Sequence, residues 1–156
     1  MNSIWEDSIN KFIDFATRHD VKMILVGGGA VNFHGYQRHS ADVDFWLDTT
    51  PENIQKLVLV FNEMGYQIDD FPEEVKNQEQ NISVKFSPAD LNLELITKFS
   101  VGKSFDEAYS SALEVVSPHD SNLKWKVISY DDLITSKVKS NRPKDLLDIL
   151  ELKKRN

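Results

Sequence analysis

The stretch from Met23 to Asp48 constrains the fold of this chain more than any other part of the sequence. Met23 to Val26 is a short apolar run that predicts a buried strand, and three consecutive glycines end it. Glycine at a strand end lets the backbone turn sharply and lets another group, such as a phosphate, approach the main chain closely. The sequence therefore predicts a strand, a glycine turn and a short helix from Gly28 to about His34.

A second apolar run begins at Asp42 and carries two aspartates. Side chains alternate along a strand, so Asp42 and Asp44 project to one face and Val43 to the other. The two carboxylates would lie roughly 6 to 7 Å apart at their Cα atoms and would suit hard cations, which prefer oxygen ligands. Two such ions would bind the attacking and the leaving oxygens of a displacement at phosphorus. The pair therefore indicates phosphoryl chemistry.

The segment between the glycines and the aspartates is suited to bind an anion. The first amides of a helix after the glycine turn would lack partners and carry partial positive charge, which favours a triphosphate. The glycines alone are not a P-loop, because the glycine-lysine-serine end of that motif is missing. Arg38 would bind phosphate oxygens through two parallel hydrogen bonds, and the hydroxyl of Ser40 would fix Asp42 or a phosphate.

Val26-Gly27-Gly28 followed by Arg38-x-Ser40-x-Asp42-Val43-Asp44 resembles the signature of the polymerase-beta-like nucleotidyltransferase superfamily. The pattern GGxAxxxHGxxRxSxDxD is most similar to the small bacterial branch that includes the nucleotidyltransferases of type IV toxin-antitoxin systems. Near the C-terminus, K...R-x-K-D-L-x-D-I is a second match to this branch. The resemblance implies an α/β (α+β) nucleotidyltransferase fold: a short mixed β-sheet with helices packed mainly on one side.

Nucleotidyltransferases of this fold usually take a third carboxylate from a strand adjacent to the aspartate pair. Two alternating runs, 82–86 and 91–95, predict a β-hairpin around Ser87-Pro88-Ala89. Glu94 in the second run is the best match, although aspartate is commoner at this position, and Asp90 beside the turn is the alternative. The resemblance thus implies catalysis and metal binding, with Mg²⁺ or Mn²⁺, by Asp42, Asp44 and Glu94.

The last helix is predicted to begin near Arg142, because Pro143 suits a first helical turn. Acidic residues in the first turn of a helix also interact favourably with the helix dipole, so their presence there does not by itself indicate a function. Arg142 and Lys144 would meet a triphosphate at this tip, and Asp145 would orient one of them. The candidate phosphate-binding residues are Gly27, Gly28, Arg38, Ser40, Lys137, Arg142 and Lys144.

The remaining sequence predicts packing elements and a loop. We expect a helix from a Ser3–Glu6 capping box to about His19, one from Thr50 and Pro51 to Gly65, and a solvated loop over 66–81. We further expect a helix opened by Ser104 and Glu107, a strand over 125–128, and a helix capped by Ser129 with Leu133, Ile134 and Val138 on its apolar side.

Length and composition predict one domain spanning residues 1–156 in a soluble, cytoplasmic protein. The chain has no cysteine, which excludes a disulfide framework. No apolar run approaches the roughly 20 residues that span a bilayer, so no membrane partner is expected. The net charge of -7 argues against broad, nonspecific nucleic-acid binding.

The favoured function is magnesium-dependent transfer of a nucleoside monophosphate from a nucleoside triphosphate to an acceptor hydroxyl, with release of pyrophosphate. The acceptor is an RNA, a protein or a small molecule, and a cognate toxin-antitoxin partner is a further candidate. The alternative is a catalytically silent nucleotidyltransferase-like binding module, for example a toxin-antitoxin component. The two aspartates favour the enzyme, whereas the glutamate at position 94 and the compact length favour the silent module.

Overall fold

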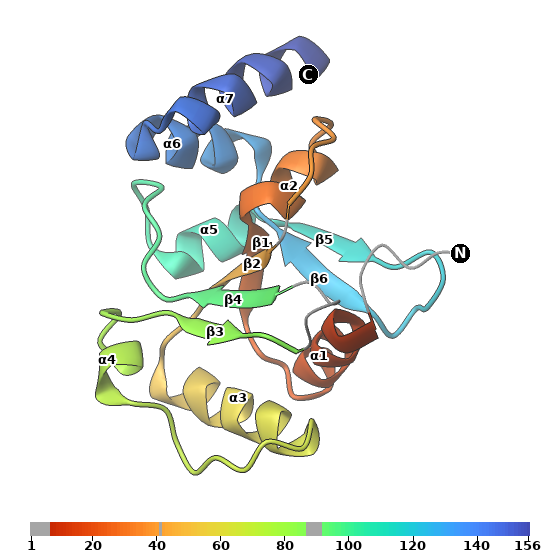
Figure 1. The fold of residues 1–156 in the computed structure, drawn as a ribbon, viewed down its shortest axis with the longest axis vertical. Helices are drawn as coiled ribbons and strands as arrows, with labels where there is room; N and C mark the ends of the chain where they lie inside the picture. Colours follow the sequence, from red (N-terminus) through yellow and green to blue (C-terminus); the bar gives the residue numbers. More distant parts are fainter. Residues whose placement is uncertain (1–6, 41, 87–91) are drawn as a thin grey trace.

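A computed structural model describes residues 7–40, 42–86 and 92–156, within which six strands form one mixed sheet in the order β3-β4-β2-β1-β6-β5 (Figure 1). The strands are β1 Met23–Val26, β2 Asp42–Leu47, β3 Ile82–Val84, β4 Asn92–Ile96, β5 Leu113–Val116 and β6 Lys124–Val127. The helices are α1 Asp7–Arg18, α2 Gly27–Phe33, α3 Pro51–Glu63, α4 Glu73–Lys76, α5 Phe105–Ser111, α6 Tyr130–Ser140 and α7 Pro143–Arg155. The mixed α/β architecture confirms the predicted fold class.

Strand pairing brings the glycine turn and the candidate carboxylates together. β1 and β2 are antiparallel, with Val26 opposite Asp44, so the glycine that follows Val26 lies beside this aspartate. β2 and β4 are parallel, with Asp44 opposite Glu94. Register partners in neighbouring strands point to the same face of a sheet. Asp42, Asp44 and Glu94 therefore share one face.

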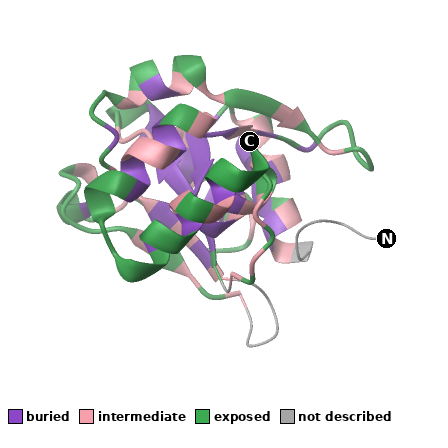
Figure 2. Ribbon diagram, turned by 90° about the horizontal axis from the view of Figure 1, so that it is seen from above, coloured by how far each residue is buried: buried purple, intermediate pink, exposed green. Residues whose placement is uncertain are grey.

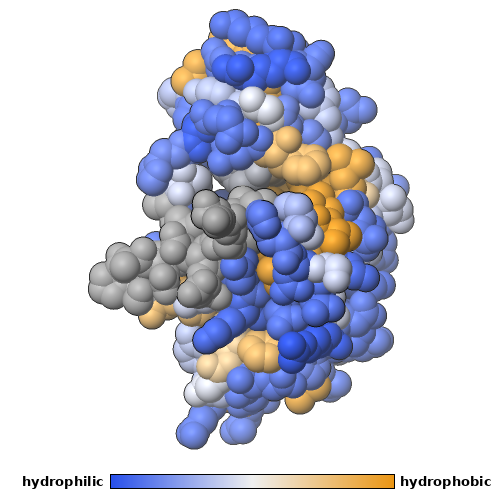
Figure 3. Space-filling model, turned by 90° about the vertical axis from the view of Figure 1, so that its right-hand side faces the viewer, coloured by the Kyte–Doolittle hydropathy of each residue, from blue (hydrophilic) through white to orange (hydrophobic). Residues whose placement is uncertain are grey.

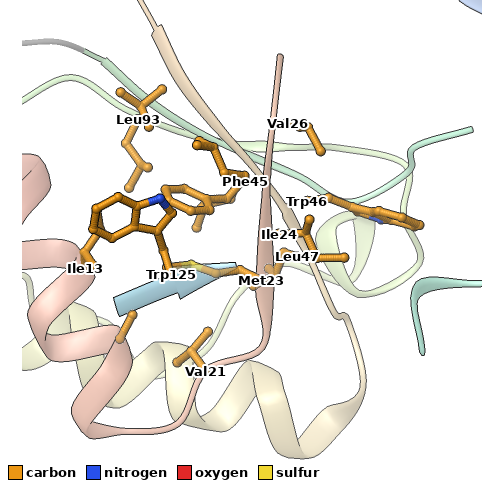
Figure 4. Packing of buried hydrophobic residues seen from close by; sticks show 14 of the residues in the cluster. Ile13, Val21, Met23, Ile24, Val26, Phe45, Trp46, Leu47, Leu93 and Trp125 are labelled. Atoms are coloured by element: carbon orange, nitrogen blue, oxygen red, sulfur yellow. The ribbon is translucent and has the colours of Figure 1, made fainter. Parts of the chain in front are cut away.

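The core forms because successive side chains of β2 point to opposite faces, as Phe45 and Trp46 do in Figure 4. On one face, the ring centroid of Phe45 lies 6.4 Å from that of Phe12 in α1, which lies 5.8 Å from Phe61 in α3. On the other face, Trp46 meets Phe105 of α5 edge-on at 5.2 Å. Figure 2 shows the buried residues gathered on the sheet and on the inner sides of the helices.

Several predicted helix starts are confirmed. The Thr50 side chain accepts a hydrogen bond from the amide of Asn53, and Pro51 occupies the first turn of α3. Ser104 and Glu107 form both hydrogen bonds of a capping box at α5. The predicted Ser3–Glu6 capping box, the Ser87-Pro88-Ala89 turn and Asp90 lie outside the described residues.

Three expectations were wrong in detail. Strand β5 was not predicted, and the predicted loop 66–81 contains the short helix α4, which buries Val75 to 1% exposure. Val138 was expected on the apolar side of α6, yet it is 59% exposed while Lys137 is 5% exposed. The charged residue faces inward because two buried carboxylates of α7 pair with its ammonium group.

Helices α6 and α7 lie together at one end of the sheet, above α2 (Figure 1). The side of α7 that faces the protein carries Asp145 and Asp148, both at most 1% exposed. Its leucines at 146, 147 and 150 are half or more exposed. Figure 3 shows one side of the molecule, which is largely hydrophilic and has its most extended hydrophobic area below the uppermost helices. Among the described residues, no helix has the length and apolarity needed to cross a membrane.

Candidate active site

A pocket of about 360 Å³ lies between the glycine turn, the start of β2 and the tips of α6 and α7. All seven predicted phosphate-binding residues and both aspartates line it. Glu94 is not among its lining residues. The lining residues are Val26, Gly27, Gly28, Arg38, His39, Ser40, Asp42, Asp44, Ile96, Phe99, Ser136, Lys137, Ser140, Arg142 and Lys144.

The two glycines at the start of α2 allow close approach by side chains of the site itself. Gly27 has a positive φ of +63°, and a Cβ there would overlap Oδ2 of Asp44. A Cβ on Gly28 would lie 2.6 Å from Oγ of Ser40. The sequence predicted that another group would approach the main chain closely at this turn. In the structure, the side chains of Asp44 and Ser40 lie close to it.

Asp44 sits in an unfavourable electrostatic environment. Burial, followed by the charges of Asp42 and Glu94, raises the pKa of its carboxyl from 3.8 to about 6, against the opposing effect of Lys144 and Lys137. A divalent cation beside the carboxylates would relieve the repulsion among them. The oxygen donors and their shared charge therefore fit a hard cation, with Asp42 and Asp44 as the residues that would hold it.

The third carboxylate lies next to the pair but is engaged elsewhere. Glu94 is opposite Asp44 on β4, and its Oε1 accepts a hydrogen bond from Oγ of Ser83 in β3 at 2.5 Å. Within residues 7–40, 42–86 and 92–156, no group of three or more histidine, cysteine, aspartate or glutamate side chains is placed to hold a metal ion. Metal binding by Glu94 stays a prediction, and its Oε2, which does not take part in the hydrogen bond with Ser83, is the oxygen that would reach the ion first.

Three cations of the site, Arg38, Lys137 and Arg142, pair with two buried carboxylates of α7. Arg38 donates to Asp148 from Nε (2.9 Å to Oδ1) and from Nη2 (3.2 Å to Oδ2). Lys137 Nζ lies 3.0 Å from Oδ2 of Asp148 and 3.4 Å from Oδ1 of Asp145. Arg142 donates from Nε and Nη2 to Asp145 at 2.8 and 3.1 Å. Five side chains thus form one network between the 38–40 loop and the start of α7.

This network favours the ionised form of the buried Asp145. Burial alone would raise the pKa of Asp145, but the hydrogen bonds from Arg142 and the charge of Lys137 outweigh it and lower the pKa. The sequence motif contained both aspartates, yet the anchoring role of Asp148 was missed. The available signal was their spacing of three residues, which places both on one side of a helix. Lys144 lies at the same tip and is exposed.

Two further contacts fix the loop between α2 and β2. The Ser40 hydroxyl donates to the carbonyl oxygen of Asp42 at 2.9 Å, which is the contact with Asp42 that the sequence suggested for this side chain. The amide of Arg38 donates to Oδ1 of Asn32 in α2 at 2.9 Å. A ring nitrogen of His34 lies 2.8 Å from the carbonyl oxygen of Ile128 and links α2 to the chain after β6.

A helix that opens on glycines beside paired strand carboxylates, on a mixed sheet, is the arrangement that the sequence resemblance to nucleotidyltransferases implies. The chain belongs to the family described as "Nucleotidyltransferase of unknown function (DUF6036)", whose family model matches residues 7–154. A search of curated proteins gave no match to this chain.

Proposed function

We propose that this nucleotidyltransferase moves a nucleoside monophosphate from a nucleoside triphosphate to an acceptor hydroxyl. The hydroxyl oxygen forms a bond to the α-phosphorus, the bond from that phosphorus to the β-phosphate oxygen breaks, and pyrophosphate leaves. The proton of the hydroxyl passes to a carboxylate of the site or to water. The observation that carries the proposal is one pocket lined by two strand carboxylates, helix-opening glycines and cations.

Each group has a role that follows from its position. The first amides of α2 and the exposed Lys144 would bind phosphate oxygens, and Lys137 and Arg142 would add positive charge beside them. Asp148 and Asp145 would keep the cations in place before the nucleotide arrives, which lowers the cost of ordering them on binding. Magnesium or manganese, held by Asp42 and Asp44 with Glu94 as third carboxylate, would supply charge neutralisation and activation of the hydroxyl.

The test has a binding part and a transfer part. Calorimetry with each nucleoside triphosphate and Mg²⁺ should show binding to the wild type that Asp42→Asn and Asp44→Asn abolish. Asp69→Asn, which neutralises an exposed carboxylate outside the pocket, is the matched control and should bind like the wild type. Labelled triphosphate incubated with a cell extract, split into RNA, protein and metabolite fractions, should then label one of them and identify the acceptor class.

One observation favours the second candidate, a catalytically silent binding module that would serve, for example, in a toxin-antitoxin pair. Glu94 is hydrogen-bonded to Ser83 and does not line the pocket. A silent module would bind a triphosphate equally well with and without Mg²⁺, and it would label no fraction of the extract. Magnesium-dependent binding that requires Asp42 would exclude it.

A further inference from the structure

The candidate pocket has two apolar side chains from the end of β4 and the segment after it. Where β4 ends, Ile96 and Phe99 contribute hydrophobic side chains to a lining that is otherwise mostly polar, charged or glycine. Ile96 follows Glu94 by two residues, which is roughly 7 Å along a strand. Ile96 is therefore displaced along the sheet from the position of Asp44, which is opposite Glu94.

Phe99 packs against a buried aromatic cluster beside the pocket. Its half-buried ring lies 5.3 Å from that of Trp46, centroid to centroid, and Trp46 is itself only 5% exposed and packs edge-on against Phe105. The backbone before it is fixed at Thr97, whose amide donates to Oδ1 of Asn81 and whose hydroxyl donates to the carbonyl oxygen of Gln80, both at 3.0 Å. A ring presented in this way loses little freedom when a flat ligand stacks on it.

We propose that Phe99, with Ile96 beside it, is the platform on which the nucleobase of the bound triphosphate stacks. This inference rests on the proposed function and adds the base-binding site to it. A nucleotide carries an anionic triphosphate and an aromatic base, and this pocket is lined by cations and by the apolar side chains of Ile96 and Phe99. Stacking on an aromatic ring tolerates all bases because each has a π-face. The ligand class is therefore nucleoside triphosphates of any base, with the larger purines bound most tightly.

Two ligands separate base binding from phosphate binding. Calorimetry should compare ATP with inorganic tripolyphosphate, each with Mg²⁺, on the wild type and on Phe99→Ala. Loss of one stacked base costs about 1 to 3 kcal/mol, or roughly 5- to 150-fold in affinity, so ATP binding should weaken by that factor. Tripolyphosphate has no base, and its affinity should not change.

Two further variants control for folding. Phe99→Leu keeps an apolar side chain against Trp46 but removes the ring, and it should show the same selective loss for ATP. Phe105→Ala removes the other aromatic contact of Trp46 outside the pocket lining. It should reduce stability while leaving the ratio of the two affinities unchanged.

Unchanged ATP affinity in both Phe99 variants, or an equal loss for ATP and tripolyphosphate, would overturn the base platform while leaving the phosphate site intact. If the wild type bound neither ligand, the proposed function itself would fail and the platform with it. A loss of affinity for ATP but not for tripolyphosphate in both Phe99 variants would establish the base platform.

Discussion

The guanidinium of Arg38 and the carboxylate of Asp148 form a two-point ion pair that joins the loop before β2 to the last helix, 110 positions further along the chain. The Asp148 side chain is 2% exposed, and that of Arg38 is 23% exposed. Lys137 contacts the same carboxylate from α6. One buried aspartate thus positions two cations of the pocket.

We expect Asp148→Asn to destabilise the protein by about 3 kcal/mol, because it leaves Arg38 and Lys137 facing a neutral amide in a poorly solvated position. Urea unfolding measures the change. The matched control is Glu151→Gln on the same helix, which removes pairs with Lys154 and Arg155, whose side chains are 72% and 45% exposed. The control should cost less than about 1 kcal/mol, and equal losses in both variants would contradict an anchoring role for Asp148.

Gly27→Ala should destabilise the fold more than Gly65→Ala. Both glycines have positive φ, +63° and +101°, so both substitutions carry the backbone penalty of about 1 kcal/mol. A Cβ at position 65 would meet nothing within 4 Å, whereas one at position 27 would overlap Asp44. A φ of +63° lies in the left-handed region that alanine can adopt and +101° lies outside it, so a larger loss of unfolding free energy at position 27, measured by urea unfolding, would come from this overlap.

The double variant Gly27→Ala, Asp44→Ala tests whether the overlap with Asp44 causes the loss of stability, because it removes the carboxylate oxygen that the new methyl group would meet. It should be less destabilised than the sum of its single changes. Additive effects would show that the backbone of the turn, rather than the carboxylate, requires glycine at position 27.

Local patterns predicted the elements that build the site. Backbone sterics make an apolar run end at the glycines, and side-chain alternation places the two aspartates on one face of a strand. Both effects depend on neighbouring residues only, so the sequence alone predicts them. Asp44 and Glu94 are adjacent because two strands that are distant in the sequence pair with each other. The expectation that Glu94 lies on a strand next to the aspartates came from the family resemblance, and the pairing of β2 with β4 confirms that placement.

The parts that sequence patterns missed involve tertiary contacts or edges. The α7 leucines at 146, 147 and 150 suggest an apolar inner face, yet Asp145 and Asp148 face inward because cations from two other segments meet them there. The spacing of the two aspartates is local, but the cations that meet them come from distant segments and leave no signature in the helix sequence. Strand β5 lies at the edge of the sheet with most of its side chains exposed, so it lacks the alternation that reveals a half-buried strand.

Lys144→Ala should weaken binding of Mg-nucleoside triphosphate by about tenfold, as expected for loss of one charge-assisted phosphate contact. Stability should stay within about 0.5 kcal/mol of the wild type, because the side chain is exposed. Lys153→Ala, an exposed lysine toward the other end of α7, is the control and should leave binding unchanged. Equal effects of the two substitutions would indicate that only the overall charge of the helix matters.

Asp44→Asn should stabilise the protein at high pH while abolishing nucleotide binding. The folded-state pKa of Asp44, about 6, lies above the ordinary value of 3.8. The folded protein therefore holds a proton between these pH values that the unfolded chain has released, and the free energy of unfolding falls as pH rises from about 3.8 to 6. Above pH 6 the wild type carries the full cost of the buried charge. Asparagine removes that cost, by about 1 to 3 kcal/mol.

Thermal or urea unfolding at pH 3.5 and pH 8 measures this effect. The variant should match the wild type at the lower pH and exceed it at the higher pH, whereas the exposed control Asp69→Asn should match the wild type at both. Mg²⁺ at pH 8 should raise the stability of the wild type and not that of Asp44→Asn, because only the carboxylate binds the ion in the folded state. A variant that is less stable than the wild type at pH 8 would contradict the cost of burying the Asp44 charge and its repulsion from Asp42 and Glu94, since a favourable partner would then hold that charge.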